Sequence, residues 1–285
     1  MVADFRAALP TASIYVYDNN SSDKTVAAAQ AAGAIVRRET RQGKGHVVRR
    51  MFADVSADIY VLVDGDGTYD APSAPKLIAR LRDEQLDMVV GARVDQEEAA
   101  YRAGHRFGNR VLTGFLALLF GRTFTDILSG YRVFSRRFVK SFPGLSGGFE
   151  IETELTVHAL ELAVPVAEIA TPYYARPEGS QSKLRTYHDG FRILWTIARL
   201  CKSERPMATF SIAAVVLALV SIVLAVPLFF TYLETGTVPR FPTAILATGI
   251  MLLAFLSLTC GLILSTVTRG RRETKRLAYL RYDSP

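Results

Sequence analysis

Short apolar runs alternate with segments of helical periodicity from the first residue to about residue 185. The run at 58–66 is almost continuously apolar, which favours a strand buried on both faces. An alternation of strands and helices is typical of a mostly parallel sheet covered by helices, in which ligands bind at the carboxyl ends of strands. The predicted strands cover 12–18, 34–39, 58–66 and 87–93, and the predicted helices cover 1–9, 22–33, 43–55 and 71–84.

The pattern changes after residue 185. Residues 207–233 and 241–267 contain no charged side chain, and each run exceeds the ~20 residues that cross the hydrocarbon core of a bilayer. Residues 186–206 place aromatic and aliphatic side chains on one helical face and basic ones on another, as in a helix that lies on a membrane surface. A surface helix of the globular part is the alternative for that segment.

These patterns predict four parts of the chain. We expect a globular α/β domain over 1–185, an amphipathic juxtamembrane helix over 186–206, two transmembrane helices within 207–267 and a basic tail over 268–285. Basic residues precede the first apolar run and follow the second. The positive-inside rule therefore predicts a cell membrane protein with the globular domain and both chain ends in the cytoplasm.

Charge and cysteine content narrow the function classes only slightly. A net charge of +7 and a pI near 9.5 suit anionic lipid, phosphorylated substrates or nucleic acid. The two cysteines, Cys201 and Cys260, form neither a disulfide framework nor a zinc-binding cluster. The four histidines are scattered, which favours solvent-exposed or structural roles.

The candidate chemistry lies in the stretch YVLVDGDGTYDA at 60–71, where a buried strand ends in acids and glycines. A calcium-binding EF-hand loop is excluded, because its sixth and twelfth positions would be Tyr69 and Pro75. The spacing of Asp64, Asp66 and Thr68 matches a phosphatase nucleophile of the haloacid dehalogenase type. It equally matches an Asp-x-Asp pair that holds Mg²⁺ or Mn²⁺ against the phosphates of a nucleotide sugar. A solvated acidic turn is the remaining reading.

Further motifs favour the nucleotide-sugar reading. The segments VYDNNSSDKT at 16–25, VDGDG at 63–67 and GKGHVVRRMF at 43–52 resemble glycosyltransferase family 2, which has the GT-A fold. Three later segments resemble the polyprenyl-phosphate sugar transferases of this family, which are similar to dolichol-phosphate mannose synthase: DILSGYRVFSRRF at 126–138, GFEIETELTVHA at 148–159 and RPEGSQSKL at 176–184. The two apolar runs resemble the two-span bacterial branch of these enzymes.

The resemblance implies roles for particular residues. It places Asp18 at the donor nucleoside, Asp64 at the donor nucleotide and the metal, and Asp66 at the metal. It makes Arg93, near the acceptor phosphate, and Asp126, which positions sugar or acceptor, the candidate catalytic residues. Glu150 and Glu152 lie at a helix start, where acids are favoured in any case, and we expect a structural or sugar-orienting role. The predicted phosphate-binding residues are Arg132, Arg176, Ser182 and Lys183, and the loop that holds the last three could instead contact anionic lipid headgroups.

The implied reaction is an inverting transfer of a hexose-type sugar from a UDP- or GDP-linked donor to a polyprenyl phosphate. It would need Mg²⁺ or Mn²⁺, take place at the cytoplasmic membrane face and serve the synthesis of cell-envelope glycans or glycoconjugates. The expected partners are the donor, the lipid acceptor and the bilayer, with no nucleic acid. The resemblance also implies a homo-oligomer, a tetramer in the two-span relatives.

One departure from the family pattern leaves a second function open. Members of the family begin with a strand before the first helix, and this chain begins within that helix, at MVADFRAALP. A sheet that lacks this strand would bind the nucleotide less well. The alternative to an active enzyme is therefore a catalytically impaired, membrane-anchored scaffold subunit.

Overall fold

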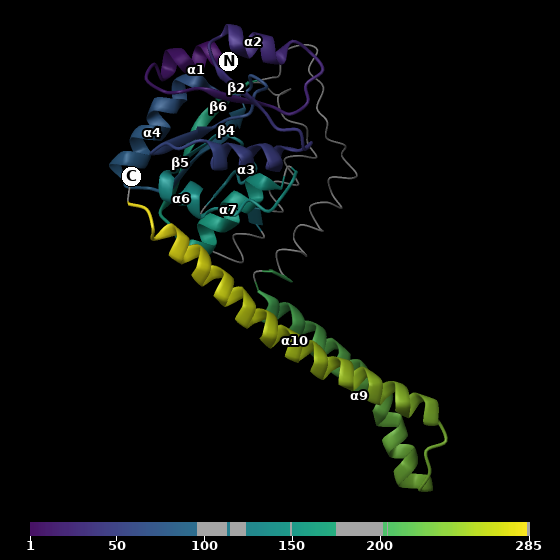
Figure 1. Cartoon of the computed structure of the whole chain (residues 1–285). Coiled ribbons are helices and arrows are strands. Elements are labelled where there is room, and N and C mark those ends of the chain that lie inside the picture. Colours follow the sequence, from purple (N-terminus) through teal and green to yellow (C-terminus); the bar gives the residue numbers. More distant parts are fainter. Residues whose placement is uncertain (96–112, 115–123, 149, 175–201, 204, 284–285) are drawn as a thin grey trace. The chain divides into compact units, whose positions relative to one another are not determined.

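The computed structural model describes residues 1–95, 113–114, 124–148, 150–174, 202–203 and 205–283 (Figure 1). The chain divides into two compact units. The globular unit comprises residues 1–193 and 274–285, and the helical unit comprises residues 194–273.

The described part of the globular unit alternates helices and strands, as the apolar pattern predicts. Pro10 follows the first helix closely, as expected of a residue that cannot continue it. The elements are α1 (Val2–Ala8), β1 (Tyr15–Asp18), α2 (Thr25–Ala31), β2 (Ile35–Arg38), α3 (Lys44–Asp54), β3 (Ile59–Leu62), the 3-10 helix η1 (Ala71–Ser73), α4 (Ala74–Asp83), β4 (Met88–Asp95), β5 (Arg132–Ser135), α6 (Arg136–Ser141), α7 (Ile151–Leu162) and β6 (Val166–Tyr173).

The strands form two sheets. Strands β1 and β2 pair in parallel with one another, and a four-stranded sheet has the order β3-β5-β4-β6. In the larger sheet β5 runs against both of its neighbours, and β4 pairs with β6 in parallel. Strands β3, β4 and β6 therefore point the same way, which agrees with the predicted mostly parallel α/β fold. The antiparallel β5 begins at Arg132, one of the predicted phosphate-binding residues.

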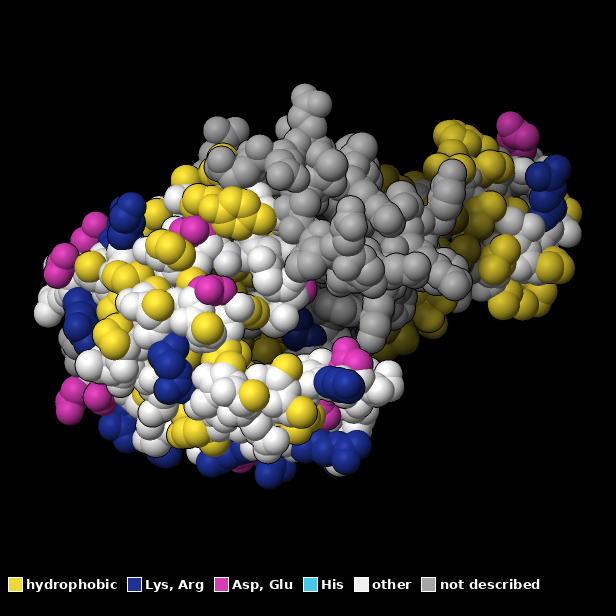
Figure 2. All heavy atoms as spheres, turned by 90° about the horizontal axis from the view of Figure 1, so that it is seen from above, with side chains coloured by type: hydrophobic (Ala, Val, Ile, Leu, Met, Phe, Trp, Pro, Cys, Tyr) yellow, Lys and Arg dark blue, Asp and Glu magenta, His cyan; other side chains and the backbone are white. Residues whose placement is uncertain are grey.

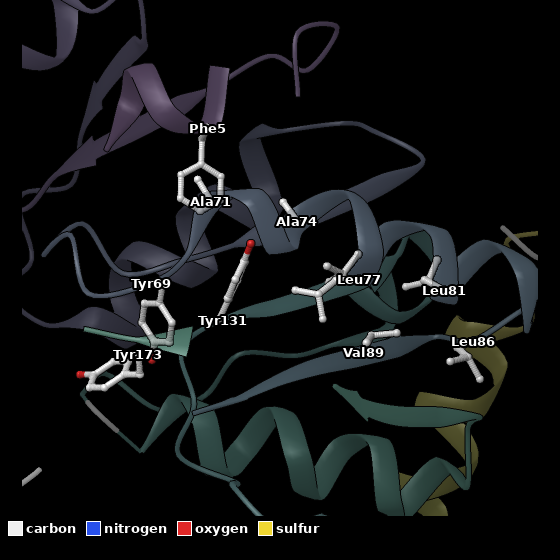
Figure 3. Close-up of a cluster of buried hydrophobic side chains, with 11 residues drawn as sticks. Phe5, Tyr69, Ala71, Ala74, Leu77, Leu81, Leu86, Val89, Tyr131 and Tyr173 are labelled. Carbon is white, nitrogen blue, oxygen red and sulfur yellow. The ribbon is translucent and has the colours of Figure 1, made fainter. Parts of the chain in front are cut away.

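A hydrophobic cluster joins α1, α4 and one face of the four-stranded sheet (Figure 3). Leu77 and Leu81 of α4 point towards Val89 of β4, and all three side chains are fully buried. Phe5 of α1 packs edge-on against Tyr131, with ring centroids 6.0 Å apart. Each buried aliphatic side chain contributes about 1.5–3 kcal/mol relative to exposure, so this cluster holds the strand ends in a fixed relation.

The end of the last helix belongs to the globular unit, within the segment predicted to be a basic tail. Helix α10 (Phe241–Tyr279) reaches that unit at residue 274. The Tyr279 hydroxyl donates to Asp87 Oδ2 at 2.8 Å, and Asp87 also accepts two hydrogen bonds from the Arg137 guanidinium. Asp87 is fully buried, so these donors satisfy a carboxylate that burial would otherwise penalise.

The helical unit contains α9 (Pro206–Thr235) and the part of α10 up to residue 273. Both helices are long and apolar enough to cross a membrane by length and composition, and only 17% and 11% of their most apolar windows are buried. In Figure 2 the visible part of this unit is mostly hydrophobic, whereas charged side chains are spread over the globular unit. Ser221 donates to the carbonyl of Ala247 at 2.7 Å, a contact typical of helices that pack through small residues in lipid.

His158 of α7 is buried in an aromatic environment. Its Nε2 atom lies 3.0 Å from Ser141 Oγ, and the rings of Phe138 and Phe142 meet it edge-on. Burial, and to a smaller extent the positive charge of Lys275, lower the pKa of His158 to about 3. The imidazole therefore stays neutral in the folded protein at any ordinary pH.

This burial predicts a pH-dependent stability of the globular unit. An unfolded histidine binds a proton near pH 6.5, so the unfolded state gains protons first as the pH falls. The free energy of unfolding should fall by up to about 1.4 kcal/mol per pH unit below pH 6.5 from this residue. Denaturant unfolding of the solubilised protein at pH 7, 6 and 5 measures the slope. The slope should become shallower in His158→Gln, and an equal slope in the variant would contradict this origin.

Candidate functional site

The two acids of the predicted metal site follow β3 directly. Asp64 lies two residues beyond the end of the strand, and its side chain is 31% exposed. Asp66 accepts hydrogen bonds from the backbone N–H and the hydroxyl of Thr68, at 3.3 and 2.7 Å. Gly67 has a φ of +76°, a conformation that glycine adopts without strain. The hydrogen bonds from Thr68 therefore fix the Asp66 side chain within the turn, whereas Asp64 stays partly open to solvent.

The backbone of Gly130 approaches the Asp64 carboxylate closely. A Cβ atom at position 130 would lie 2.5 Å from Asp64 Oδ2, which is closer than real atoms approach. The Gly130 N–H donates to the Tyr69 hydroxyl at 2.9 Å, so the loop before β5 is tied to the acidic turn. Glycine at position 130 therefore leaves the room that the Asp64 carboxylate occupies.

Arg93 and Asp126, the two predicted catalytic residues, meet in a bidentate ion pair. Arg93 donates from Nε to Asp126 Oδ2 at 2.7 Å and from Nη2 to Oδ1 at 2.8 Å, and its backbone N–H reaches Oδ2 at 3.2 Å. Glu168 of β6 accepts from the backbone N–H of Asp126 at 3.1 Å. Both side chains are largely buried, so each charge compensates the other and fixes its orientation.

The sheet brings this ion pair to the same edge as Asp64. In the register of the sheet, Arg132 of β5 pairs with Leu62 of β3 on one side and with Val90 of β4 on the other. Asp64 and Arg93 therefore extend from the carboxyl ends of two strands that lie about 10 Å apart, two strand spacings. A row of aromatic side chains connects them: Tyr69 packs on Tyr173, and the Arg93 guanidinium lies over the Tyr173 ring.

Asp18 lies at the end of β1 and is buried. Its Oδ1 atom accepts from the backbone N–H of Ser21 at 3.1 Å, and hydrogen bonding by Ser21 lowers the pKa of the Asp18 carboxyl. The neighbouring Asn19 donates to the carbonyls of Glu39 and Arg41 and accepts from the Gly43 N–H. The first motif therefore organises the loop that leads into α3.

Lys44, the first residue of α3, contacts Asp64 from the other side. Its ammonium group bridges Asp64 Oδ1 and Glu152 Oε1 of α7 in two ion pairs. Burial lowers the pKa of Lys44, but the charges of Glu152 and Asp64 outweigh burial and raise it above its ordinary value. Lys44 is therefore a permanent cation beside the predicted metal ligand.

The glycines around Lys44 explain how it reaches this place. Cβ atoms at Gly43 and Gly45 would collide with the backbone of the loop at 146–147, so only glycine allows the start of α3 to pack there. Glu154 of α7 holds the same loop, accepting from the N–H groups of Leu145 and Ser146 at 2.9 and 2.8 Å. Helices α3 and α7 lie side by side as a result (Figure 1).

Of the four predicted phosphate-binding residues, Arg132 alone lies within the part of the chain that the structure describes. Arg132 is fully buried, and its guanidinium donates to the carbonyls of Ser129 and Ile127 and to the hydroxyl of Thr156. This environment does not support a phosphate contact for Arg132; its hydrogen bonds hold the turn before β5. Arg176, Ser182 and Lys183 lie outside the described residues, as does most of the predicted amphipathic helix at 186–206.

Sequence reasoning assigned no site role to Lys44, Gly130 or Tyr69, and only a broad one to Glu152. The Gly-Lys-Gly sequence at 43–45 carried a signal for Lys44, because glycines on both sides of a basic residue indicate a close backbone approach. Glu152 looked like an ordinary acid at a helix start, and no local pattern distinguishes it from Glu154.

The residues at this edge fit a divalent metal ion. Asp64 and Asp66 offer carboxylate oxygens, the ligands that Mg²⁺ and Mn²⁺ prefer. Among the described residues no group of three or more His, Cys, Asp or Glu side chains could hold a metal. A site with only one or two protein ligands suits Mg²⁺ in particular, because this ion keeps water and substrate phosphate oxygens as its other ligands.

Comparison with known proteins gives the family. Residues 5–142 match the family described as Glycosyl transferase family 2. An uncharacterized protein of Shigella flexneri is 57% identical over 154 residues, which are 54% of this chain and 94% of that protein. The chain belongs to glycosyltransferase family 2.

Relatives with functional names include two proteins of Haloferax volcanii. Glycosyltransferase AglJ is 37% identical over 201 residues, 70% of this chain and 66% of that protein. A dolichyl-phosphate hexose transferase is 26% identical over 187 residues, 66% of this chain and 80% of that protein.

Solved structures support the GT-A fold. The glucosyl-3-phosphoglycerate synthase of Mycobacterium tuberculosis in complex with phosphoglyceric acid has a TM-score of 0.55 at 21% identity, over 70% of this chain and 73% of that one. The same enzyme with Mn²⁺ and UDP-glucose has a TM-score of 0.52 at 21% identity, over 71% and 82% of the two chains. At this identity the likeness establishes the fold alone, and it confirms the predicted fold class.

Gly130→Ala tests the close packing at Asp64. The added methyl group should displace the carboxylate and lower the rate of sugar transfer by about tenfold to a hundredfold, as misplacements near 1 Å do. The transfer rate and the melting temperature of the purified protein are measured together. Gly270→Ala is the matched control, since a Cβ there meets nothing within 4 Å and should leave the rate unchanged. A full rate in Gly130→Ala would mean that the position of Asp64 is unimportant.

Arg93→Lys and Asp126→Asn test whether the ion pair acts as one unit. Lysine keeps the positive charge but cannot form the paired hydrogen bonds of arginine, so each single variant should lose about tenfold or more in rate. Partners in direct contact are non-additive, so the double variant should lose little more than the worse single variant. Additive losses would show that the two residues act independently.

Proposed function

We propose that this protein is an inverting hexosyltransferase. It transfers a sugar from a UDP- or GDP-linked donor to a polyprenyl phosphate at the cytoplasmic face of the cell membrane, in the synthesis of envelope glycans or glycoconjugates. The observation that carries the proposal is the register of the sheet, in which Asp64 and the Arg93–Asp126 pair follow the carboxyl ends of β3 and β4 on either side of β5. Family membership and the dolichyl-phosphate hexose transferase relative support the same reading.

The donor would bind across the carboxyl ends of β1 and β3. Asp18 would contact the nucleoside, and Asp64 and Asp66 would hold Mg²⁺ or Mn²⁺ against the diphosphate. The ion supplies charge neutralisation for the departing nucleoside diphosphate. Gly65 leaves room for the diphosphate at the turn, since nothing lies within 4 Å of a Cβ built there.

The acceptor requires little acid–base chemistry from the protein. A phosphate monoester oxygen is already anionic near neutral pH and can attack C1 of the sugar directly, on the face opposite the leaving group. The task of the side chains is alignment and charge compensation. Arg93, held in one orientation by Asp126, would orient the acceptor phosphate, and Arg176, Ser182 and Lys183 remain predicted contacts for phosphate groups.

The helical unit supports a membrane-bound acceptor. Large apolar side chains such as Val223, Phe229 and Leu233 of α9 are more than half exposed, a surface that water disfavours and lipid accepts. Two such helices would keep the enzyme at the membrane surface where a polyprenyl phosphate presents its headgroup. The proposed cytoplasmic placement of the globular unit rests on the distribution of basic residues. The proposed tetramer rests on the resemblance of the sequence to the two-span polyprenyl-phosphate sugar transferases.

Two alternatives to sugar transfer are a phosphatase and a scaffold subunit. Membership of glycosyltransferase family 2 favours sugar transfer over the phosphatase chemistry that the Asp-x-Asp-x-Thr spacing alone allows. A scaffold subunit with impaired catalysis would keep the fold and the membrane helices but would transfer no sugar.

A panel of labelled UDP- and GDP-sugars, incubated with the purified protein, polyprenyl phosphate and Mg²⁺ or Mn²⁺, tests the proposal. We expect transfer from one donor, its loss on chelation of the metal, and a drop of at least about a hundredfold in Asp66→Ala, because charge stabilisation of the leaving group is lost. The measurement is labelled lipid extracted after short incubations.

The matched control is Asp58→Ala, which removes a carboxylate that is 93% exposed just before β3. This variant should transfer sugar at the wild-type rate. Full activity in Asp66→Ala would refute the metal assignment. No transfer from any donor in the panel would favour the scaffold.

A further inference from the structure

The contact between Lys44 and Asp64 occupies one of the two carboxylate oxygens that could bind the proposed metal. The Lys44 ammonium touches Asp64 Oδ1 on one side and Glu152 Oε1 on the other, and its side chain is only 17% exposed. Glu152 is nearly fully buried, and its second oxygen, Oε2, accepts no hydrogen bond within the part of the chain that the structure describes. One carboxylate oxygen next to the ammonium is thus unused.

An ammonium ion and a divalent ion cannot share a carboxylate oxygen at contact distance without strong repulsion. Two like charges about 4 Å apart repel by several kcal/mol at a dielectric constant of about 20, the value that suits protein sites. A divalent ion can therefore bind Asp64 Oδ1 only if Lys44 moves away from that oxygen.

The surroundings allow the ammonium to move without moving α3. Gly43 and Gly45 are packed against the loop at 146–147, so the backbone at Lys44 is fixed. The four-carbon stem of lysine is flexible and carries a compact charge that can shift between neighbouring acceptors. Glu152 Oε2 offers the acceptor that the ammonium needs when it leaves Asp64.

We propose that Lys44 is an internal counter-ion of the metal site, which neutralises Asp64 in the metal-free protein and withdraws onto Glu152 when a divalent ion binds. This inference rests on the proposed function, because it takes Asp64 as a metal ligand. In this arrangement the affinity for metal depends on a competition between two cations for one carboxylate. Glu152 is a positioning residue that determines how easily Lys44 gives way.

The competition predicts opposite effects of two substitutions on metal affinity. Lys44→Gln removes the competing cation, so the full-length protein in detergent should bind Mn²⁺ on the order of tenfold more tightly. Glu152→Gln removes the acceptor to which Lys44 withdraws, so the same protein should bind Mn²⁺ more weakly than wild type by a similar factor. The electron paramagnetic resonance signal of free Mn²⁺, titrated against protein without nucleotide, measures both affinities. A residue with a purely structural role would not shift the affinity in opposite directions.

The double variant Lys44→Gln, Glu152→Gln keeps the test valid if burying an unpaired Glu152 charge destabilises the single variant. It leaves neither charge, so it should fold and bind Mn²⁺ about as tightly as Lys44→Gln. Mn²⁺ affinity in the Lys44 variants equal to or below that of wild type would overturn the proposal, as would tighter binding in Glu152→Gln.

Asp64→Asn separates this inference from the proposed function. If wild type binds Mn²⁺, Asp64→Asn abolishes binding and Lys44→Gln changes nothing, the metal site stands and the counter-ion role fails. If neither wild type nor any Lys44 variant binds Mn²⁺, and no sugar is transferred, both fail. If wild type binds Mn²⁺ too weakly to measure and Lys44→Gln binds it, the counter-ion role is supported.

Discussion

The structure of the site depends on the need to compensate negative charge at the end of a buried strand. Strand β3 delivers Asp64 to the edge of the sheet, and α7 brings Glu152 towards the same point. Two carboxylates in a partly buried place repel one another and resist desolvation. Lys44 reduces both the repulsion and the cost of desolvation, because its ammonium contacts both carboxylates. The start of α3, the loop at 146–147 and the start of α7 are arranged around that contact.

The same constraint recurs elsewhere in the globular unit. Asp126 is compensated by the fork of Arg93, and Asp87 is compensated by Arg137 and Tyr279. The two pairs belong to opposite ends of β4: Asp87 precedes the strand, and Arg93 lies near its carboxyl end. One strand therefore connects the candidate site to the segment of α10 that packs on the globular unit, and burial makes both pairs sensitive to loss of either partner.

Much of the fold could be predicted because its signals are local. The apolar runs at 58–66 and 87–93 contain β3 and β4, and Gly33 and Pro10 follow the ends of their helices as expected. The Asp-Gly-Asp sequence after β3 left a phosphatase nucleophile, a metal–diphosphate site and a solvated turn open, and the motifs before and after it favoured the metal and the diphosphate. The family could be predicted because its motifs are short and follow a fixed order along the chain, and the match over residues 5–142 confirms it.

The sequence by itself determined the α/β class, the apolar helices and the identity of the acids at the end of β3, since each depends on neighbouring residues. Only the tertiary structure decided that β5 runs antiparallel between β3 and β4, and that the Arg132 guanidinium forms its hydrogen bonds within the core. It also decided that Lys44 meets Glu152, more than a hundred positions away. Pairing across the sheet and between helices depends on how distant segments pack, and no local pattern records which buried charge will meet which.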